Sequence, residues 1–286
     1  MDAAGAPRIV LTRPAGRNGS LAQALREEGL DVLEAPALRI DMLDAPRPAA
    51  QPGDLLVFVS GQAVTAYFGG SGTAAGDPQA GAPGGAERGG PQHGPSGDTA
   101  GWPPGAWAGA VGPATGRALQ ARVPPDHILM PAAGRPPDSE ALLAAIDERR
   151  LPPARAHILR ATRGRDWLAV QLRERGWQVA CHALYRRLPC DWDRRTCLGL
   201  SGAGAAVLLL TSAEALAAIE SSLLRQDLPW PAALHVVTLH ERIARRLQCR
   251  YAGQPGKVLH VTLSSPDEAA LFQAIVAATR QLSRRT

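Results

Sequence analysis

The sequence feature that most constrains the fold of this chain is an internal repeat, in which residues 8–39 resemble residues 156–189. The segments LAQALREEGLDV and LAVQLRERGWQV align without a gap, and the tails that follow them, PALR and ALYR, fall in the same register. The alternative is a chance match between two amphipathic helices of a kind common in α/β proteins, and the matching tails make it the less favoured reading. The repeat therefore predicts two related halves.

Each copy reads as a strand, a turn, a helix and a second strand. In the second copy, strands at 157–160 and 177–181 flank a helix at 166–175. Asp166 is expected to cap this helix by accepting a backbone N–H bond. Gly176 follows the helix, where a residue that tolerates positive φ is favoured.

Two further strands, at 54–60 and 205–212, are apolar on both faces, as parallel strands tend to be. Each ends in a serine that is followed by a helix start. Counted along the chain, each half holds about five short strands that alternate with helices. The expected fold class is α/β, with two parallel sheets covered by helices on both faces.

Residues 69–105 interrupt this pattern with Gly, Pro, Ala and polar residues without periodicity. Such a segment buries too little apolar surface to offset the entropy of ordering it. We expect a disordered insertion in a surface loop, with a functional lid as the less favoured alternative.

Composition excludes several classes of function. The net charge is +5, and 30 of the 31 basic residues are arginine, since Lys257 is the sole lysine. The arginines are scattered and aromatic residues make up only 4%, so no nucleic-acid partner is expected, whereas a basic surface suits an acidic small molecule. The sequence shows no apolar run long enough for a membrane span and no export signal, and its four cysteines form no CxxC pair. A reduced, cytoplasmic protein without metal is expected.

Nucleotide-binding and hydrolase signatures are missing from the sequence. No GxGxxG follows a strand, and neither GxxxxGK[ST] nor GxSxG occurs. We therefore expect no cofactor.

What remains is a set of turns at the carboxyl ends of the predicted strands, where ligands bind in open parallel sheets. Any one of them is an ordinary βα loop, but six in duplicated positions favour a binding cleft. Their small and hydroxyl side chains leave backbone N–H groups accessible, and their arginines can bind carboxylates. The candidate binding residues are Arg13, Ser60, Gly61, Gln62, Thr115, Arg160, Arg165, Ser212, Ala213 and His240.

These turns resemble the uroporphyrinogen-III synthase family, whose sparse landmarks occur here in the expected order. The resemblance covers the chain apart from residues 69–105. The motifs that carry it are TRP (12–14), FVSGQAV (58–64), VGPAT (111–115), DSEALL (138–143), the R…GR turn and helix (160–176), YRR (185–187) and LTSAE (210–214). Two positions depart from the family pattern: His240 stands in a turn where many members have a GPTT-like sequence, and Gln62 replaces the usual Asn.

The resemblance implies two flavodoxin-like domains, the second inserted into the first and joined to it by a two-stranded connector. One domain is then 1–36 plus 188–286 and the other 40–182, with connectors at 35–40 and 183–188. The thin connectors imply domains that move as rigid bodies.

The resemblance also implies a reaction, the cyclisation of hydroxymethylbilane with inversion of the last pyrrole ring and loss of water. This is a hydro-lyase reaction of haem biosynthesis without a cofactor. The linear substrate can close unaided to the uninverted isomer, so the enzyme must chiefly impose a conformation.

Tyr185 is the one candidate with a proton to offer the leaving hydroxyl, and the resemblance places it facing the cleft. The alternative is a tyrosine that merely packs. Three functions stay open: the synthase, a two-domain protein that binds an acidic small molecule without catalysis, and a relative that lost activity through the altered turn at His240. We expect a monomer, because no long amphipathic helix is left without a place in the two sheets.

Overall fold

The computed structural model describes residues 6–69, 102–252 and 255–284. Residues 70–101, which form most of the predicted insertion, lie outside the described residues. The chain divides into two compact units: unit 1 consists of residues 1–40 and 187–286, and unit 2 of residues 41–186. The two boundaries fall inside strands β3 (Leu38–Met42) and β8 (Gln178–Pro189).

Unit 1 is a five-stranded parallel sheet with the order β11-β10-β9-β1-β2. Numbered by their order along the chain and read from the β2 edge, its strands run 2-1-3-4-5, the order of flavodoxin-like folds. Its elements are β1 (Arg8–Leu11), α1 (Gly19–Glu27), β2 (Val32–Glu34), α6 (Arg194–Ser201), β9 (Ala205–Leu210), α7 (Ala213–Arg225), β10 (Ala233–Thr238), α8 (Glu241–Tyr251), β11 (Val258–Leu263) and α9 (Glu268–Ser283).

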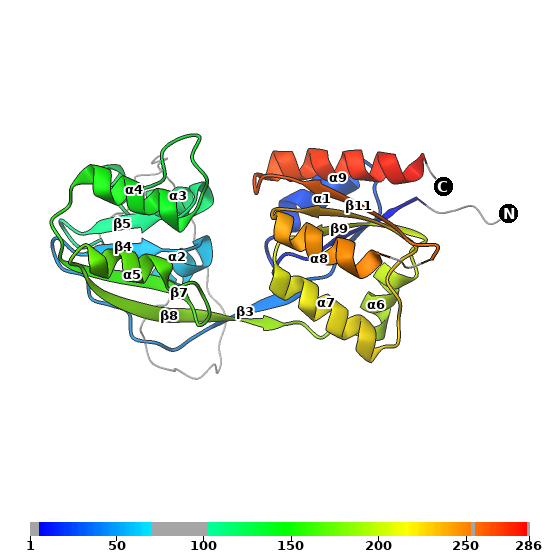
Figure 1. Ribbon diagram of the computed structural model, residues 1–286, viewed down its shortest axis with the longest axis horizontal. Coiled ribbons are helices and arrows are strands. Elements are labelled where there is room, and N and C mark those ends of the chain that lie inside the picture. Colours follow the sequence, from blue (N-terminus) through cyan, green and yellow to red (C-terminus); the bar gives the residue numbers. More distant parts are fainter. Residues whose placement is uncertain (1–5, 70–101, 253–254, 285–286) are drawn as a thin grey trace, which may run out of the picture. The chain divides into compact units, whose positions relative to one another are not determined.

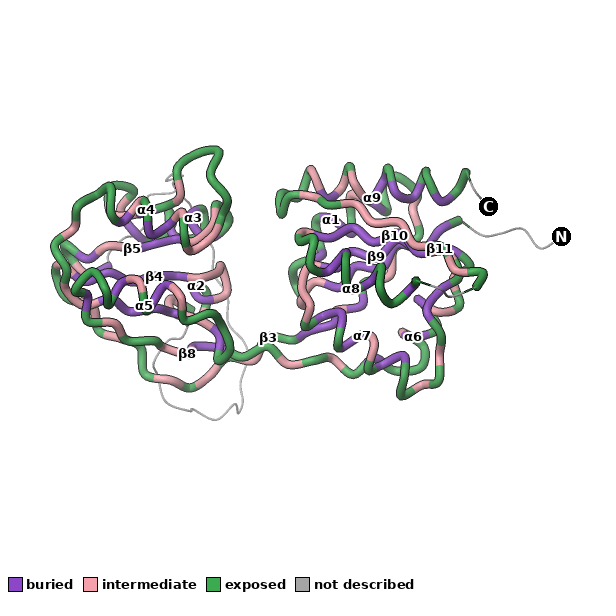
Figure 2. The backbone as a smooth tube through the Cα atoms, in the orientation of Figure 1, coloured by how far each residue is buried: buried purple, intermediate pink, exposed green. Residues whose placement is uncertain are grey.

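Along the unit 1 strands, successive side chains pack alternately into two hydrophobic cores, one on each face of the sheet. Ile9 and Val207 pack on one face with the apolar sides of α1 and α9. Val10 and Leu208 pack on the other face with α6, α7 and α8. Figure 1 shows these helices on the two faces of the sheet, and Figure 2 shows the buried strands at its centre. The expected fold class, two parallel α/β units with helices on both faces, is confirmed.

Unit 2 has the sheet order β3-β8-β7-β4-β5-β6. Apart from β3 its strands occupy the same 2-1-3-4-5 arrangement, but the chain enters at the third position, so the unit is circularly permuted relative to unit 1. Its remaining elements are β4 (Leu55–Phe58), α2 (Gly61–Phe68), β5 (Trp107–Ala110), α3 (Pro113–Gln120), the 3₁₀ turn η1 (Pro125–His127), β6 (Ile128–Leu129), α4 (Ser139–Arg149), β7 (Arg155–Ala161) and α5 (Trp167–Glu174).

The repeat in the sequence corresponds to β1-α1-β2 in unit 1 and β7-α5-β8 in unit 2. Gly29 and Gly176 follow the two helices with φ of 74° and 85°, which confirms the expected helix stop. The expected cap by Asp166 is wrong. Its carboxylate accepts no backbone N–H of α5 and instead lies 2.6 Å from Nη1 of Arg160, which competes for the same oxygen.

The predicted insertion extends too far at its C-terminal end. Trp102 is buried, and its ring centroid lies 6.5 Å from that of Phe58 and 6.2 Å from that of Phe68. Its indole Nε1 donates to the carbonyl of Ala106 at 3.0 Å. An isolated tryptophan inside a Gly/Pro-rich run shows no periodicity, so the sequence pattern did not reveal that it packs.

Among the described helices, none has the combination of length and apolar character that crossing a bilayer requires.

Candidate active site

Three strands of unit 2 place candidate residues at one edge of its sheet. β4 pairs in parallel with both β5 and β7, so the carboxyl ends of these strands meet at the same edge. Ser60 follows β4, Thr115 lies in the first turn of α3 after β5, and Arg160 is near the end of β7. The structure thus brings these three predicted residues to one edge.

The side chain of Ser60 meets Tyr185 at this edge. Ser60 is the N-cap of α2, and its Oγ accepts a hydrogen bond from the backbone N–H of Ala63 at 3.3 Å. The same Oγ lies 2.9 Å from the hydroxyl oxygen of Tyr185, so the two hydroxyls are hydrogen-bonded. A helix cap and a side chain from β8 therefore form one hydroxyl pair.

Tyr185 is fully buried, with 0% of its surface exposed, whereas Ser60 is half-buried. The expectation that the Tyr185 hydroxyl opens directly onto a cleft is therefore wrong. The register of β8 against β7 shifts at Arg160 and Ala161, and Ala161 pairs with Tyr185. Because such a bulge re-aims the residues that follow it, the sequence alignment of the two tails could not reveal the direction of this side chain.

The other unit 2 candidates lie in the first turns of α2 and α3. Gly61 and Gln62 are the first two residues of α2, and both are half-buried. Thr115 is only 5% exposed, and its backbone N–H donates to the carbonyl of Gly112. The first turn of a helix directs N–H groups outward, so this edge presents two helix N-termini that favour an anion.

Both predicted arginines of unit 2 are held by acidic side chains. Nη1 of Arg160 lies 2.6 Å from Oδ1 of Asp166, and Nη2 of Arg165 lies 2.6 Å from Oε1 of Glu140. The Arg160 side chain is 19% exposed while that of Asp166 is 70% exposed. A substrate carboxylate that binds Arg160 must therefore compete with a carboxylate of the protein.

Unit 1 carries an equivalent edge. Its parallel strands β1, β9 and β10 end at one side of the sheet, where Arg13, Ser212 and His240 follow them. The Oγ of Ser212 accepts the backbone N–H of Ala215 at 3.0 Å as the N-cap of α7, and Ala213 begins that helix. His240 is exposed and is the N-cap of α8, but its side chain makes no cap hydrogen bond.

Arg13 is tied to its own unit by several hydrogen bonds. Its Nε donates to Oδ1 of Asn18 at 3.2 Å, and its Nη2 lies 3.2 Å from Oε1 of Glu268. The hydroxyl of Ser20 donates to the other oxygen of Glu268 at 2.9 Å. These bonds orient the guanidinium at the strand ends of unit 1.

Sequence reasoning did not predict that Glu140, Asp166 and Glu268 hold these arginines. Glu140 and Glu268 lie in the first turns of α4 and α9, where the helix dipole favours a negative charge. That preference is the one signal that could have drawn attention to them. Their pairing with arginines far along the chain depends on the fold.

The opposite edge of unit 2 holds a separate charged cluster. Asp54 precedes β4, and both of its oxygens bind Arg155 at the start of β7, at 3.1 Å and 2.6 Å. Burial raises the pKa of the Asp54 carboxyl, but the hydrogen bonds from Arg155 and from the Gln51 N–H outweigh it and hold that pKa below its usual range. Burial lowers the pKa of the neighbouring His157. This cluster stabilises the strand starts and lies away from the candidate site.

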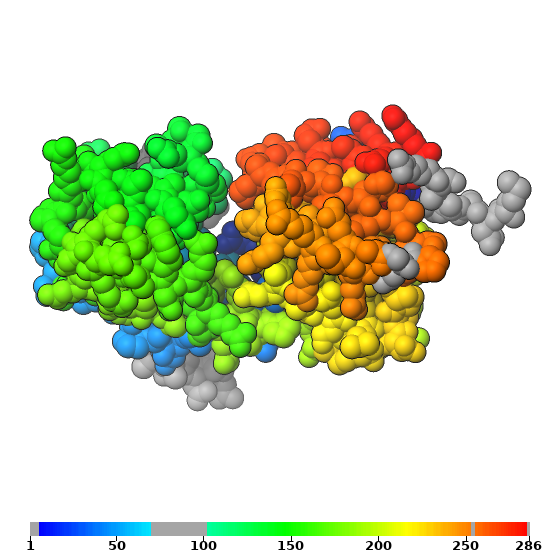
Figure 3. Space-filling model, viewed as in Figure 1, coloured from blue at the N-terminus to red at the C-terminus, as the bar shows by residue number. Residues whose placement is uncertain are grey.

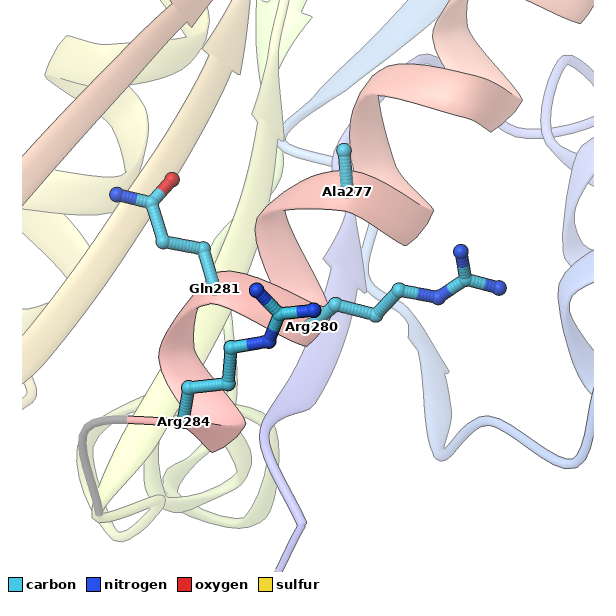
Figure 4. A pocket seen from close by; sticks show the side chains of 4 residues that line it. All are labelled: Ala277, Arg280, Gln281 and Arg284. Atoms are coloured by element: carbon cyan, nitrogen blue, oxygen red, sulfur yellow. The ribbon is translucent and has the colours of Figure 1, made fainter.

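Two other surfaces carry many arginines. Helix α8, orange in Figure 3, pairs Arg245 with Glu241 at 2.6 Å and Arg246 with Glu220 at 2.9 Å, so much of its charge is balanced locally. A pocket of about 350 Å³ lies along α9, and Figure 4 shows its lining side chains pointing from one helix. They come from the C-terminal half of α9 and from its C-cap residue Arg284, far from the strand ends where that helix begins. The pocket is lined by Ala277, Arg280, Gln281 and Arg284.

No group of three or more His, Cys, Asp or Glu side chains within the described ranges is arranged to hold a metal ion.

Comparison with known proteins gives one decisive match. A sequence model described as uroporphyrinogen-III synthase HemD matches residues 19–255, well over half of the chain. The chain belongs to the uroporphyrinogen-III synthase family. Membership in this family supports the synthesis of uroporphyrinogen III as its function, and binding without catalysis is not favoured.

A solved structure of a uroporphyrinogen-III synthase shares the fold. A mutant enzyme from the extremely thermophilic bacterium Thermus thermophilus is 17% identical, with a TM-score of 0.50, and the match covers 96% of this chain and 100% of the other. The synthetase from Helicobacter pylori is 13% identical, with a TM-score of 0.49, covering 98% and 99% of the two chains. No curated protein sequence matches significantly.

Proposed function

We propose that this uroporphyrinogen-III synthase acts as a hydro-lyase that closes hydroxymethylbilane with inversion of its last pyrrole ring. We further propose that it works as a cytoplasmic monomer without a cofactor. The observation that carries the proposal is the Ser60–Tyr185 hydroxyl pair, with its oxygens 2.9 Å apart at the edge where α2 begins. It combines a group that carries a proton with a helix terminus that binds anions.

The reaction needs one proton at its start. Protonation of the terminal hydroxyl lets the C–O bond break, so that water leaves and an azafulvene-like cation remains. The last ring then attacks through its substituted carbon, and a spiro intermediate rearranges to the inverted ring. A proton lost from the ring carbon at closure replaces the proton taken at the start. Tyr185 supplies the first proton, because its phenol hydroxyl is a hydrogen-bond donor.

The remaining candidate residues hold the substrate's carboxylates. In unit 2, Arg160 offers its guanidinium group near the end of β7, and Arg165 offers its own in the turn between β7 and α5. In unit 1 the groups that would bind substrate carboxylates are Arg13, Ser212, His240 and the start of α7 at Ala213. Because binding is spread over many contacts, loss of any one of them should raise KM modestly.

The test is an assay of the purified chain with hydroxymethylbilane, in which type I and type III products are separated by chromatography. The expected result is type III product formed faster than the spontaneous closure to type I. Type I product at the spontaneous rate, with the ligand bound and retained, would support a binding protein and contradict the proposal.

Replacement of Tyr185 by Phe tests its role as the acid. Tyr185→Phe removes the hydroxyl and keeps the buried ring, so we expect type III formation to slow by about 10-fold or more with an unchanged fold. Circular dichroism and thermal unfolding check the fold. Wild-type turnover in this variant would show that the tyrosine only packs.

A further inference from the structure

We propose that Ser60, rather than Tyr185, delivers the proton to the leaving hydroxyl of the substrate, and that Tyr185 supplies it through Ser60. This inference rests on the proposed function and deepens it. The geometry that carries it is a fully buried phenol whose hydroxyl is hydrogen-bonded to a half-buried serine at a helix N-terminus.

Burial decides which of the two hydroxyls reaches the substrate. A general acid must come within hydrogen-bond distance of the atom that it protonates. Tyr185 has 0% of its surface exposed, so no bound molecule touches it in this structure. Ser60 retains exposed surface at the edge formed by β4, β5 and β7. The serine is therefore the member of the pair that contacts the substrate.

The hydrogen bonds of Ser60 allow a proton to pass from Tyr185 through the serine. A hydroxyl oxygen has two acceptor sites and one proton to donate. The Oγ of Ser60 already accepts the N–H of Ala63. When it also accepts the Tyr185 hydroxyl proton, both acceptor sites are filled and its own proton points away from α2. That proton is then available to the substrate oxygen.

The step balances without any further reagent. Ser60 gives its proton to the terminal hydroxyl while the C–O bond breaks, and Tyr185 gives its proton to Ser60 at the same time. Water and an azafulvene-like cation result, together with a tyrosinate. The proton that the ring carbon loses at closure returns through Ser60 and restores Tyr185.

Unit 1 contains a version of this arrangement without the tyrosine. Ser212 caps α7 as Ser60 caps α2, and both serines accept the N–H three residues on. The residue of unit 1 that aligns with Tyr185 in the repeat is Leu38, which is buried and apolar. The cap is therefore common to both units, and the acidic partner is found in unit 2. Comparing variants of the two serines therefore distinguishes a structural role as a helix cap from a role in proton transfer.

The experiment is a double-mutant cycle in the full chain with hydroxymethylbilane as substrate. The variants are Ser60→Ala, Tyr185→Phe and the double variant, and kcat and KM for type III formation are measured for each. We expect each single change to lower kcat by about 10-fold or more, and the double variant to be no slower than the slower single variant. Ser60→Thr keeps a hydroxyl and is expected to retain most of kcat.

Ser212→Ala is the matched control, because it removes the same cap from unit 1. We expect it to raise KM and to leave kcat far closer to wild type than Ser60→Ala does. Asp193→Ala, which removes the N-cap of α6, reports the effect of losing a cap outside the candidate site. Thermal unfolding of all variants measures the stability lost with each cap. A fall in kcat that exceeds what this loss of stability explains then reports on proton transfer.

Three outcomes would overturn the inference. The first is a wild-type kcat in Ser60→Ala together with a lowered kcat in Tyr185→Phe. The second is a double variant whose loss of kcat is the product of the two single losses, and the third is a Ser60→Thr variant with a kcat as low as that of Ser60→Ala. In each of these the wild-type chain still makes type III product, so the proposed function stands. A wild-type chain that makes none would instead contradict the proposed function itself.

Discussion

At the scale of single residues, the three arginines of the candidate site already have anionic partners. Arg160, Arg165 and Arg13 each lie within 3.2 Å of a carboxylate oxygen of the same unit. In each pair the carboxylate is exposed to solvent, and ion pairs at a protein surface contribute little to stability, typically under about 1 kcal/mol. They keep long side chains oriented, and they exchange readily when a ligand brings a carboxylate of its own.

Removal of the partner of Arg160 is expected to tighten substrate binding. Asp166→Asn removes the competing charge and leaves the guanidinium available, so KM should fall by about 2- to 5-fold with kcat unchanged. Arg160→Leu should raise KM. The control is Asp147→Asn, which breaks a similar pair with Arg175 at the other end of α5 and should not change KM. A higher KM in Asp166→Asn would show that the aspartate positions the arginine for the substrate.

The sequence predicted the hydroxyl and arginine members of the site, because they follow strands whose apolar patterns are clear. It did not predict the partners of these groups. The contacts of Arg160 with Asp166 and of Ser60 with Tyr185 depend on turn geometry and on a one-residue register shift in β8. Neither feature leaves a periodic trace in the sequence.

A buried histidine in unit 1 is expected to make stability depend on pH. Burial, with a contribution from the charge of His260, lowers the pKa of His235 to about 4. The unfolded chain binds a proton at this histidine near pH 6.5 and the folded chain does not, so its contribution is fully present above pH 6.5. As the pH falls from 6.5 to 4, the free energy of unfolding should fall by about 3 kcal/mol.

The measurement is denaturant unfolding of wild type and His235→Gln between pH 7 and pH 4. Glutamine has no proton to gain, so the variant should lose less stability than wild type over this range. Parallel pH dependences for the two proteins would contradict the prediction.

At the scale of secondary-structure elements, the repeated β-α-β segment explains why the two units share a layout. Leu21 and Leu25 in α1 and Leu168 and Leu172 in α5 are all buried, as the aligned sequences predict. Both helices end before a glycine with positive φ. What the sequence did not predict is the missing cap hydrogen bond of Asp166, because the carboxylate pairs with Arg160 instead.

The two helix stops are expected to behave alike on mutation. Gly29→Ala and Gly176→Ala each force a Cβ into the left-handed region, so each should lower the free energy of unfolding by about 1 kcal/mol. Gly204→Ala is the control, because Gly204 has ordinary φ and open space around it. Thermal or denaturant unfolding measures all three. Equal stability of Gly29→Ala and Gly204→Ala would contradict the strain argument.

At the scale of the whole molecule, one unit is continuous in sequence and the other is not. Unit 2 occupies residues 41–186, and the apolar cluster that includes Leu55, Ile158 and Leu172 belongs to it alone. Unit 1 joins residues from both ends of the chain. The repeat in the sequence indicated two related units. The permuted strand order of unit 2 could not be predicted from it, because strand order depends on pairings between distant segments.

A chain of residues 41–186 is therefore expected to fold on its own with a cooperative unfolding transition. Leu172→Ala should destabilise this fragment by about 3 kcal/mol, through lost burial and a cavity. Leu216→Ala lies in a core of unit 1 and should leave the transition of unit 2 in the full chain unchanged. A fragment without cooperative unfolding would show that unit 2 needs unit 1.

The pairing of β1 with β9 has a consequence for synthesis of the protein. Ile9 is paired with Val207, and all of unit 2 is translated between them. The apolar strand RIVL therefore leaves the ribosome long before its neighbour exists, while unit 2 can complete its core in the meantime. A nascent chain of this kind exposes an unpaired strand edge for much of translation, which is the period when aggregation or chaperone capture is expected.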